Sequence, residues 1–180
     1  MTISKEIREQ VQQRANYACE FCGVRETDVG GTLTIDHYQP QSKGGSDKLE
    51  NLIYSCACCN QYKQDYWNTD ESSPKLWNPR SELYEKHFIE LEDGQLVALT
   101  LTGEFTCKRL RLNRPPLIAH RLQRRRQAEK TRLLEQYQDV VLSLTQLNTQ
   151  LTNLVTEQQD LLKQQRDILR ALLRNQQDSF

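Results

Sequence analysis

The chain has 180 residues, a hydrophobic content of 37% and a mean hydropathy of −0.77, which indicate one polar domain with an extension. No run of residues approaches the eighteen apolar positions of a membrane-spanning helix, and residues 1–6 lack the apolar core of a secretory signal, so we expect a cytoplasmic protein without a membrane partner. The formal net charge is zero, but residues 105–132 carry ten basic groups and one acidic group. This basic band is typical of phosphate contact, so the neutral balance does not exclude a nucleic-acid partner.

The first predicted element is a helix over residues 3–17, in which Ser4 is the expected N-cap and apolar residues recur at helical spacing. The run Cys19-Glu20-Phe21-Cys22-Gly23 follows it and is typical of a zinc knuckle, because glycine permits the tight turn that two thiolates need. Residues 24–32 are polar and end in two glycines, which predicts a loop before the first strand.

Four cysteines form two Cys-x-x-Cys pairs, Cys19 with Cys22 and Cys56 with Cys59. Four thiolates fill the tetrahedron around zinc and leave no position for water, so this site is expected to be structural. The alternative is ordinary buried cysteine; disulfide bonding is disfavoured without a secretory signal. Cys58 could replace Cys59 but does not repeat the two-residue spacing, and Cys107 is expected to be a small core residue.

The stretch from Asp36 to Lys63 contains the residues suited to a second, catalytic metal site. Asp36 follows a short apolar run, and its carboxylate suits magnesium or manganese. Asn60 opens a helix-capable segment and can point back at the same ion. His37 points to the other side of a strand from Asp36. Histidine has an unperturbed pKa near neutrality, so His37 suits the general base that phosphodiester hydrolysis requires.

With Gly44, Gly45 and Asn51 between its two apolar runs, this stretch resembles the ββα-metal fold of the HNH endonucleases. The resemblance implies that His37 activates water and that Asn51 braces the loop that orients it. It also implies that two residues ligate the catalytic ion, Asp36 and Asn60. Position 60 is Asn where many family members carry His, which leaves the metal preference open.

The resemblance implies a small zinc-stabilised ββα-metal nuclease domain over residues 1–116. With the long C-terminal α-helical, coiled-coil-like extension that the apolar spacing predicts over residues 117–180, the expected fold class is α+β. The resemblance is most specific over residues 19–63 and extends loosely to about residue 125. The implied activity is metal-dependent hydrolysis of phosphodiester bonds in single- or double-stranded DNA, leaving a 3′-hydroxyl and a 5′-phosphate. The Lys63 position matches a basic helix position of the family and is expected near phosphate.

The region between the ββα stretch and the tail is expected to be partly irregular. Residues 65–79 are polar and contain prolines, and residues 89–101 alternate around Asp93-Gly94, which predicts a hairpin. A helix is expected to begin within residues 105–114 and to be interrupted by Pro115-Pro116. His87 is open between a structural role and a second site near the phosphate.

Clustered basic residues are the candidate nucleic-acid contacts, because lysine and arginine neutralise phosphate charge. They are Lys63, Lys108, Arg109, Arg111, Arg114, Arg121, Arg124, Arg125 and Arg126.

From Leu117 to Phe180 the sequence has neither glycine nor proline, and apolar residues recur at steps of four and three. They stand at positions 133, 137, 140, 144, 147, 151, 154, 161, 168 and 172, with Gln158 and Gln165 as polar members. This heptad seam predicts that residues 130–175 bind further copies of the chain or a larger protein partner. Packing against the nuclease domain is the alternative, and the Thr- and Asn-rich run 145–153 leaves a bend or hairpin open.

Three hypotheses therefore stand. The first is a metal-dependent HNH endonuclease. The second is a non-catalytic, zinc-stabilised nucleic-acid-binding or adaptor subunit; His37, Asp36 and Asn60 count against it. The third, compatible with the first, is an effector subunit whose tail docks on a defence, restriction or guided-nuclease assembly.

Overall fold

The computed structural model describes residues 3–68, 70 and 73–177, with side chains described as far as residue 171. The chain divides into two units, Met1–Arg125 and Arg126–Phe180. The first unit combines short helices with two small antiparallel sheets, and the second is helical, so the α+β class expected from the sequence is confirmed. The first unit extends past the expected boundary at residue 116 because Leu117 and Arg121 are buried.

The N-terminal helix α1 (Lys5–Arg14) is shorter than the expected range of residues 3–17. The Ser4 hydroxyl accepts a hydrogen bond from the backbone amide of Ile7 at 3.3 Å, as expected of an N-cap. The helix stops at Arg14 because Asn16 and Tyr17 adopt positive φ angles, which no right-handed helix accommodates. A short helix not expected from the sequence, α2 (Glu26–Val29), lies within the polar residues before the first strand.

The central ββα unit is formed by β1 (Thr34–His37), β2 (Leu52–Ser55) and α3 (Ala57–Lys63). The two strands pair antiparallel with Asp36 opposite Ile53 and His37 opposite Leu52. All four residues of β2 are buried, while β1 keeps partial exposure. Two 3-10 turns, η1 (Gln41–Lys43) and η2 (Leu49–Asn51), shape the loop between the strands. The strand–loop–strand–helix order expected for residues 33–63 is therefore present.

After residue 80 the chain forms a second group of short elements. They are α4 (Tyr84–His87), the hairpin of β3 (Phe88–Glu90) and β4 (Leu96–Ala98), and α5 (Leu101–Arg109). The hairpin is antiparallel, as its Asp93-Gly94 turn predicts, and Gly94 has a φ of 79°. His87 is 3% exposed, and its Nδ1 lies 2.6 Å from the Thr100 hydroxyl, which also caps α5. The structure thus gives His87 a structural role.

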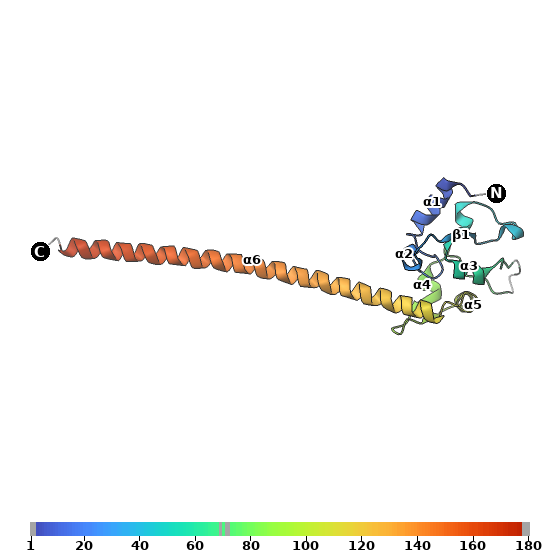
Figure 1. Cartoon of the computed structure of the whole chain (residues 1–180). Helices are drawn as coiled ribbons and strands as arrows, with labels where there is room; N and C mark the ends of the chain where they lie inside the picture. Colours follow the sequence, from blue (N-terminus) through green and yellow to red (C-terminus); the bar gives the residue numbers. More distant parts are fainter. Residues whose placement is uncertain (1–2, 69, 71–72, 178–180) are drawn as a thin grey trace. The chain divides into compact units, whose positions relative to one another are not determined.

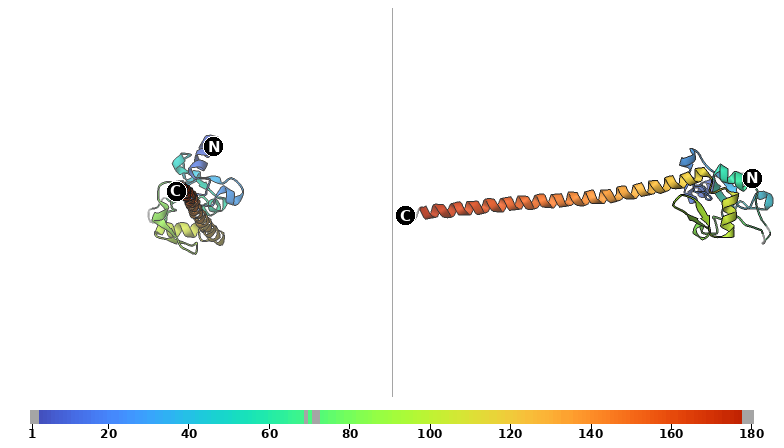
Figure 2. Two further views of the ribbon diagram at one scale, coloured as in Figure 1. Left: turned by 90° about the vertical axis from the view of Figure 1, so that its left-hand side faces the viewer. Right: turned by 90° about the horizontal axis from the view of Figure 1, so that it is seen from below.

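The last helix, α6 (Pro115–Gln177), is a single element drawn without a break (Figure 1, Figure 2). Pro115 opens this helix where the sequence predicted an interruption, because the first helical position needs no amide donor and suits the fixed φ of proline. No turn divides residues 145–153, so the hairpin alternative does not hold. None of the described helices, α6 included, combines the length and the apolarity needed to cross a bilayer.

Candidate metal centre and active site

Four cysteine sulfurs converge between the knuckle after α1 and the start of α3. Those of Cys19, Cys22, Cys56 and Cys59 all lie within 4.8 Å of one another. The Cys22 and Cys56 sulfurs are 3.7 Å apart, close to the separation of about 3.8 Å that a tetrahedral zinc with bonds of about 2.3 Å requires. The donor set and its geometry therefore fit the structural zinc that the spacing predicts. Cys58 is exposed and Cys107 is partly buried, so neither belongs to the cluster.

Local backbone geometry explains this convergence. The amide of Gly23 donates to the carbonyl of Cys19 at 2.8 Å, and the positive φ of Gly23, 76°, closes the knuckle turn. On the other side, Cys56 is the N-cap of α3, where its sulfur accepts a hydrogen bond from the amide of Cys59 at 3.4 Å. The same side chain is thus placed both to bind metal and to begin the helix.

Hydrogen bonds between the sulfurs lower the pKa of Cys19 and Cys56 and raise the pKa of Cys22 and Cys59, so thiolate is favoured at two of the four positions. Hydrogen bonds from the thiols of Cys19, Cys22 and Cys59 lower the pKa of Cys56. Burial is the largest single influence on Arg114 and acts to lower its pKa, but the sulfurs of Cys59, Cys22 and Cys56 together outweigh burial and raise that pKa above its usual value. Arg114 therefore supplies positive charge beside the sulfurs, and its guanidinium also lies 5.5 Å from the ring centroid of Tyr62. The sequence predicted a nucleic-acid contact at Arg114, whereas the structure places it against the cysteine cluster.

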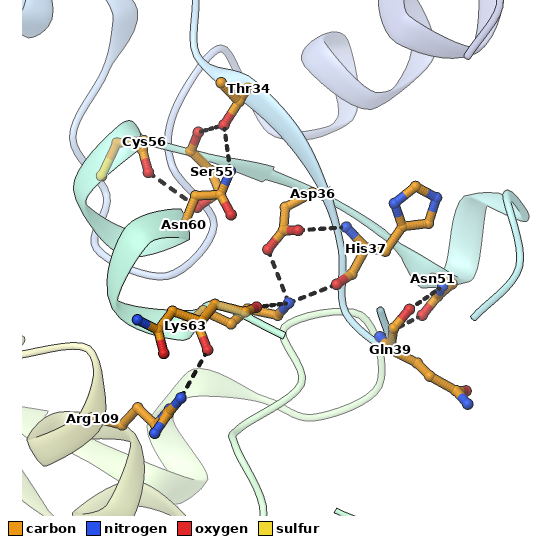
Figure 3. Close-up of polar contacts among 11 residues, drawn as sticks. Thr34, Asp36, His37, Gln39, Asn51, Ser55, Cys56, Asn60, Lys63 and Arg109 are labelled. Atoms are coloured by element: carbon orange, nitrogen blue, oxygen red, sulfur yellow. Dashed lines mark hydrogen bonds and ion pairs between the residues drawn. The ribbon is translucent and has the colours of Figure 1, made fainter. Parts of the chain in front are cut away.

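Asp36 on β1 and Lys63 on α3 form a buried ion pair at the centre of the ββα unit (Figure 3). The Lys63 ammonium lies 3.0 Å from Asp36 Oδ2 and donates to the carbonyl of His37 at 2.7 Å. Its side chain is fully buried, and its own carbonyl accepts from Arg109 at 3.1 Å. The sequence predicted Lys63 at phosphate; burial of the ammonium against β1 corrects that placement, because the residue fixes helix to strand instead.

His37 directs its ring away from the Asp36 carboxylate, as strand alternation predicts (Figure 3). Its Nε2 lies 2.7 Å from Oδ1 of Asp47, which also accepts from the side-chain amide of Gln41 at 2.7 Å. Hydrogen bonds from His37 and Gln41 lower the pKa of Asp47, so this carboxylate stays charged. Asp47 is a site residue that the sequence reasoning missed; its only signal was its place in the Gly-Gly-Ser-Asp loop.

Asn51 ties the loop between the strands to the end of β1 (Figure 3). Its Oδ1 accepts from the amide of Gln39 at 2.8 Å, and its Nδ2 donates to the carbonyls of Gln39 at 3.0 Å and Ser46 at 2.8 Å. Gly45 makes the close approach possible, because a Cβ at this position would lie 1.8 Å from the Gln39 carbonyl oxygen. The loop that carries Asp47 is thereby held against the strand that carries His37.

Asn60 lies on the face of α3 that meets β1, where its amide nitrogen is 3.5 Å from the Thr34 hydroxyl (Figure 3). Thr34 and Asp36 share one face of the strand, so Asn60 and Asp36 border the same side of the sheet. Asp36 Oδ2 is buried, and the polar partner recorded for it among the described residues is the Lys63 ammonium at 3.0 Å. One carboxylate and one amide are oxygen donors suited to magnesium, which takes few protein ligands and fills its shell with water and phosphate oxygens. The residues therefore fit such an ion in chemistry, with Lys63 as the competing cation.

The remaining basic residues divide by exposure. Arg121 is 3% exposed, and its guanidinium donates to the carbonyls of Gly94 and Leu112, so burial corrects its predicted role in phosphate binding. Arg109 is partly buried, with its guanidinium 4.5 Å from the Tyr66 ring centroid. The exposed members are Lys108, Arg111, Arg124, Arg125 and Arg126. Lys108 pairs with Glu104 and Arg124 with Glu90, each at 2.6 Å.

Comparison with known proteins points to the same residues. The HNH endonuclease family matches residues 19–65. The type II restriction enzyme KpnI of Klebsiella pneumoniae is 35% identical over 82 residues, which cover 37% of this chain and 38% of KpnI. The chain thus spans well under half of that relative's length. No solved structure gives a significant match.

Proposed function

We propose that the chain is a metal-dependent endonuclease that hydrolyses phosphodiester bonds in DNA, because residues 19–65 match the HNH endonuclease family. The observation that carries this proposal is the arrangement of His37, Asp36 and Asn60 on the ββα unit, beside a zinc-type cysteine cluster. DNA is the proposed substrate because the relative is named a restriction enzyme. A role in defence or restriction is proposed on the same ground.

In this mechanism His37 takes a proton from the attacking water. The Asp47 carboxylate accepts from His37 Nε2, which holds the ring in one orientation and tautomer and leaves Nδ1 to accept the proton. Positive charge that forms on the ring is then offset by Asp47. Asn51 keeps the loop, and Asp47 with it, in place through its three hydrogen bonds.

Asp36 and Asn60 are the proposed holders of a magnesium or manganese ion. Such an ion offsets the negative charge that develops on the phosphate and on the leaving oxygen. Lys63 holds α3 against β1 through its ion pair with Asp36 and its hydrogen bond to the His37 carbonyl, and so sets the distance between Asp36 and Asn60. Exposed basic residues supply phosphate contacts, with Arg111, Arg125 and Arg126 proposed first because no acidic side chain is recorded as their ion-pair partner among the described residues.

One observation favours a second candidate function, a zinc-stabilised nucleic-acid-binding module without catalysis. The Lys63 ammonium already neutralises the Asp36 carboxylate, so the chain can satisfy that charge without a divalent ion. In this alternative the basic surface binds nucleic acid and the ββα unit is only a scaffold.

Cleavage of supercoiled plasmid with magnesium or manganese separates the two candidates. His37→Ala removes the base and should lower the rate by about a hundredfold to ten-thousandfold with zinc content unchanged. His120→Ala is the matched control, because His120 also pairs with an aspartate, Asp28, at 2.9 Å, and should retain the wild-type rate. Wild-type protein that binds DNA but cuts with neither ion would establish the second candidate. A His37→Ala protein as active as wild type would exclude the proposed mechanism.

A further inference from the structure

The second unit, Arg126–Phe180, carries an apolar stripe along α6 that leaves its side chains open to solvent. Written as heptads, the stripe has Leu at most d positions, with Leu144 and Leu151 at a. A neighbouring row at e is Leu134, Val141, Val155, Leu162 and Leu169. The aliphatic members of the three rows between Leu133 and Leu169 are each 44–62% exposed in the structure. Positions d, a and e adjoin on a helix, so they form one continuous face.

The amount of exposed apolar surface on this face matches what a stable interface requires. Burying a leucine-sized side chain removes on the order of 100 Å² from water. With about half or more of most of these side chains exposed, the rows together offer roughly 800 Å² on one helix, which is the contribution of each partner to a typical specific interface. A monomeric protein rarely exposes a contiguous apolar patch of this size.

Polar members of the seam indicate what covers it. Gln158 and Gln165 stand at a positions, on the centre line of the face. A parallel, in-register copy sets each glutamine beside its own counterpart, where the two side-chain amides can hydrogen-bond to each other. An antiparallel copy that overlaps the seam end to end would set Gln158 against Leu147 and Gln165 against Val140, and leave the amides unsatisfied.

We propose that α6 associates in parallel and in register with further copies of this chain, through the face formed by its d, a and e rows. For each glutamine to pair with another glutamine, the partner helix must carry glutamine at the same positions along its length. A second copy of the chain meets this requirement. The width of the face, three positions per heptad, allows two or more helices to share it.

Parallel association has a consequence for DNA cleavage, which rests on the proposed nuclease function. The first unit precedes the same end of α6 in every copy, so parallel pairing brings two ββα sites to one end of the assembly. Two sites acting together can cut both strands of a duplex, whereas a single site nicks one strand.

The test compares two kinds of leucine substitution in the full chain. Leu147→Glu with Leu151→Glu places two charges in the seam, and Leu142→Glu places one such charge at an f position, where the leucine is also exposed. Sedimentation should give a multimer for wild type and for Leu142→Glu, and a monomer for the double variant. Zinc content and the thermal transition of the first unit check that each protein is folded.

Orientation is measured by cross-linking in a Cys58→Ser background, which removes the exposed native thiol. Ile168→Cys, at a d position, should form an intermolecular disulfide under mild oxidation, whereas Leu142→Cys should not. A monomeric wild type would overturn the proposal. So would multimers that fail to cross-link at position 168 or that dissociate equally with Leu142→Glu.

Plasmid assays keep the two proposals apart. Wild type should convert supercoiled plasmid to linear product, and the double variant should yield mainly nicked circles. A wild type that forms the parallel multimer yet cuts nothing would refute the nuclease function and leave the self-association intact.

Discussion

Lys63 on α3 places its ammonium 3.0 Å from the carboxylate of Asp36 on β1, and the lysine side chain has no solvent exposure. This ion pair and the hydrogen bond from Lys63 to the His37 carbonyl link the helix and strand of the ββα unit, beside the longer contact of Asn60 with Thr34. The integrity of the ion pair therefore bears on both the stability of the protein and the position of the strand that carries His37.

Replacing Lys63 with methionine should destabilise the protein by about 3 kcal/mol, because the Asp36 carboxylate is left largely buried without its partner. Urea unfolding in the presence of zinc measures the change. Lys43→Met, at an exposed lysine, should cost less than about 0.5 kcal/mol. Adding Asp36→Asn to Lys63→Met should recover part of the loss by removing the orphaned charge. Equal stabilities for the two lysine variants would show that the ion pair contributes nothing.

Asn51→Ala should slow cleavage and lower the free energy of unfolding by about 1–3 kcal/mol, because it leaves the backbone groups of Gln39 and Ser46 without partners. Asn51→Asp keeps the acceptor for Gln39 but turns a carboxylate oxygen toward two carbonyls, so it should do no better than alanine. Cleavage rates and thermal transitions of the three proteins are compared below the lowest transition. Full activity in Asn51→Asp would mean that the donated hydrogen bonds do not matter.

Cys56→Ser should abolish zinc binding and cooperative folding, because it removes a metal ligand and weakens the start of α3 in one change. Cys58→Ser alters the same helix only two residues away, at an exposed thiol, and should leave zinc content and thermal transition as in wild type. Elemental analysis with thermal unfolding gives both readouts. Zinc retained at wild-type stoichiometry by Cys56→Ser would remove Cys56 from the ligand set.

Arg114→Met should weaken zinc retention about 10–100-fold, because the guanidinium that offsets thiolate charge beside Cys59 is lost. Competition with a chromogenic chelator measures this change. Arg111→Met is the control: Arg111 lies 4.9 Å from the centroid of the same Tyr62 ring, and no contact with the cysteines is recorded for it. Equal zinc affinities for these two variants would mean that the charge of Arg114 does not strengthen zinc binding and that its contact with the Tyr62 ring is all that matters.

Spacing in the sequence was enough to predict the two Cys-x-x-Cys pairs and the Asp93-Gly94 hairpin, since each depends on residues close together along the chain. The ββα order was predicted from the resemblance to the HNH endonucleases. Burial was not predictable in the same way. Lys63 and Arg121 look like surface charges in the sequence, but carbonyls supplied by distant segments hold both inside the first unit. Asp47 was missed because its partner, His37, is brought to it only when the loop closes over Asn51.

The first and last residues of the helices were also predicted incorrectly from the sequence, because a helix end depends on the backbone angles of single residues. Pro115 opens α6 where a break was expected, and positive φ at Asn16 and Tyr17 stops α1 before residue 17. Proline at a first helical position and proline at a break look alike in sequence when the flanking residues suit either structure.

The cysteine cluster also sets an order of events during synthesis. Its four ligands lie within residues 19–59, whereas the apolar seam begins at Leu133. At about 5–20 residues per second, the ribosome makes the seam several seconds after the last ligand has been added. A metal ion can therefore close the ββα unit before the part of α6 that we propose to self-associate exists. Each ββα unit would then mature within its own chain, and the proposed assembly between chains would follow.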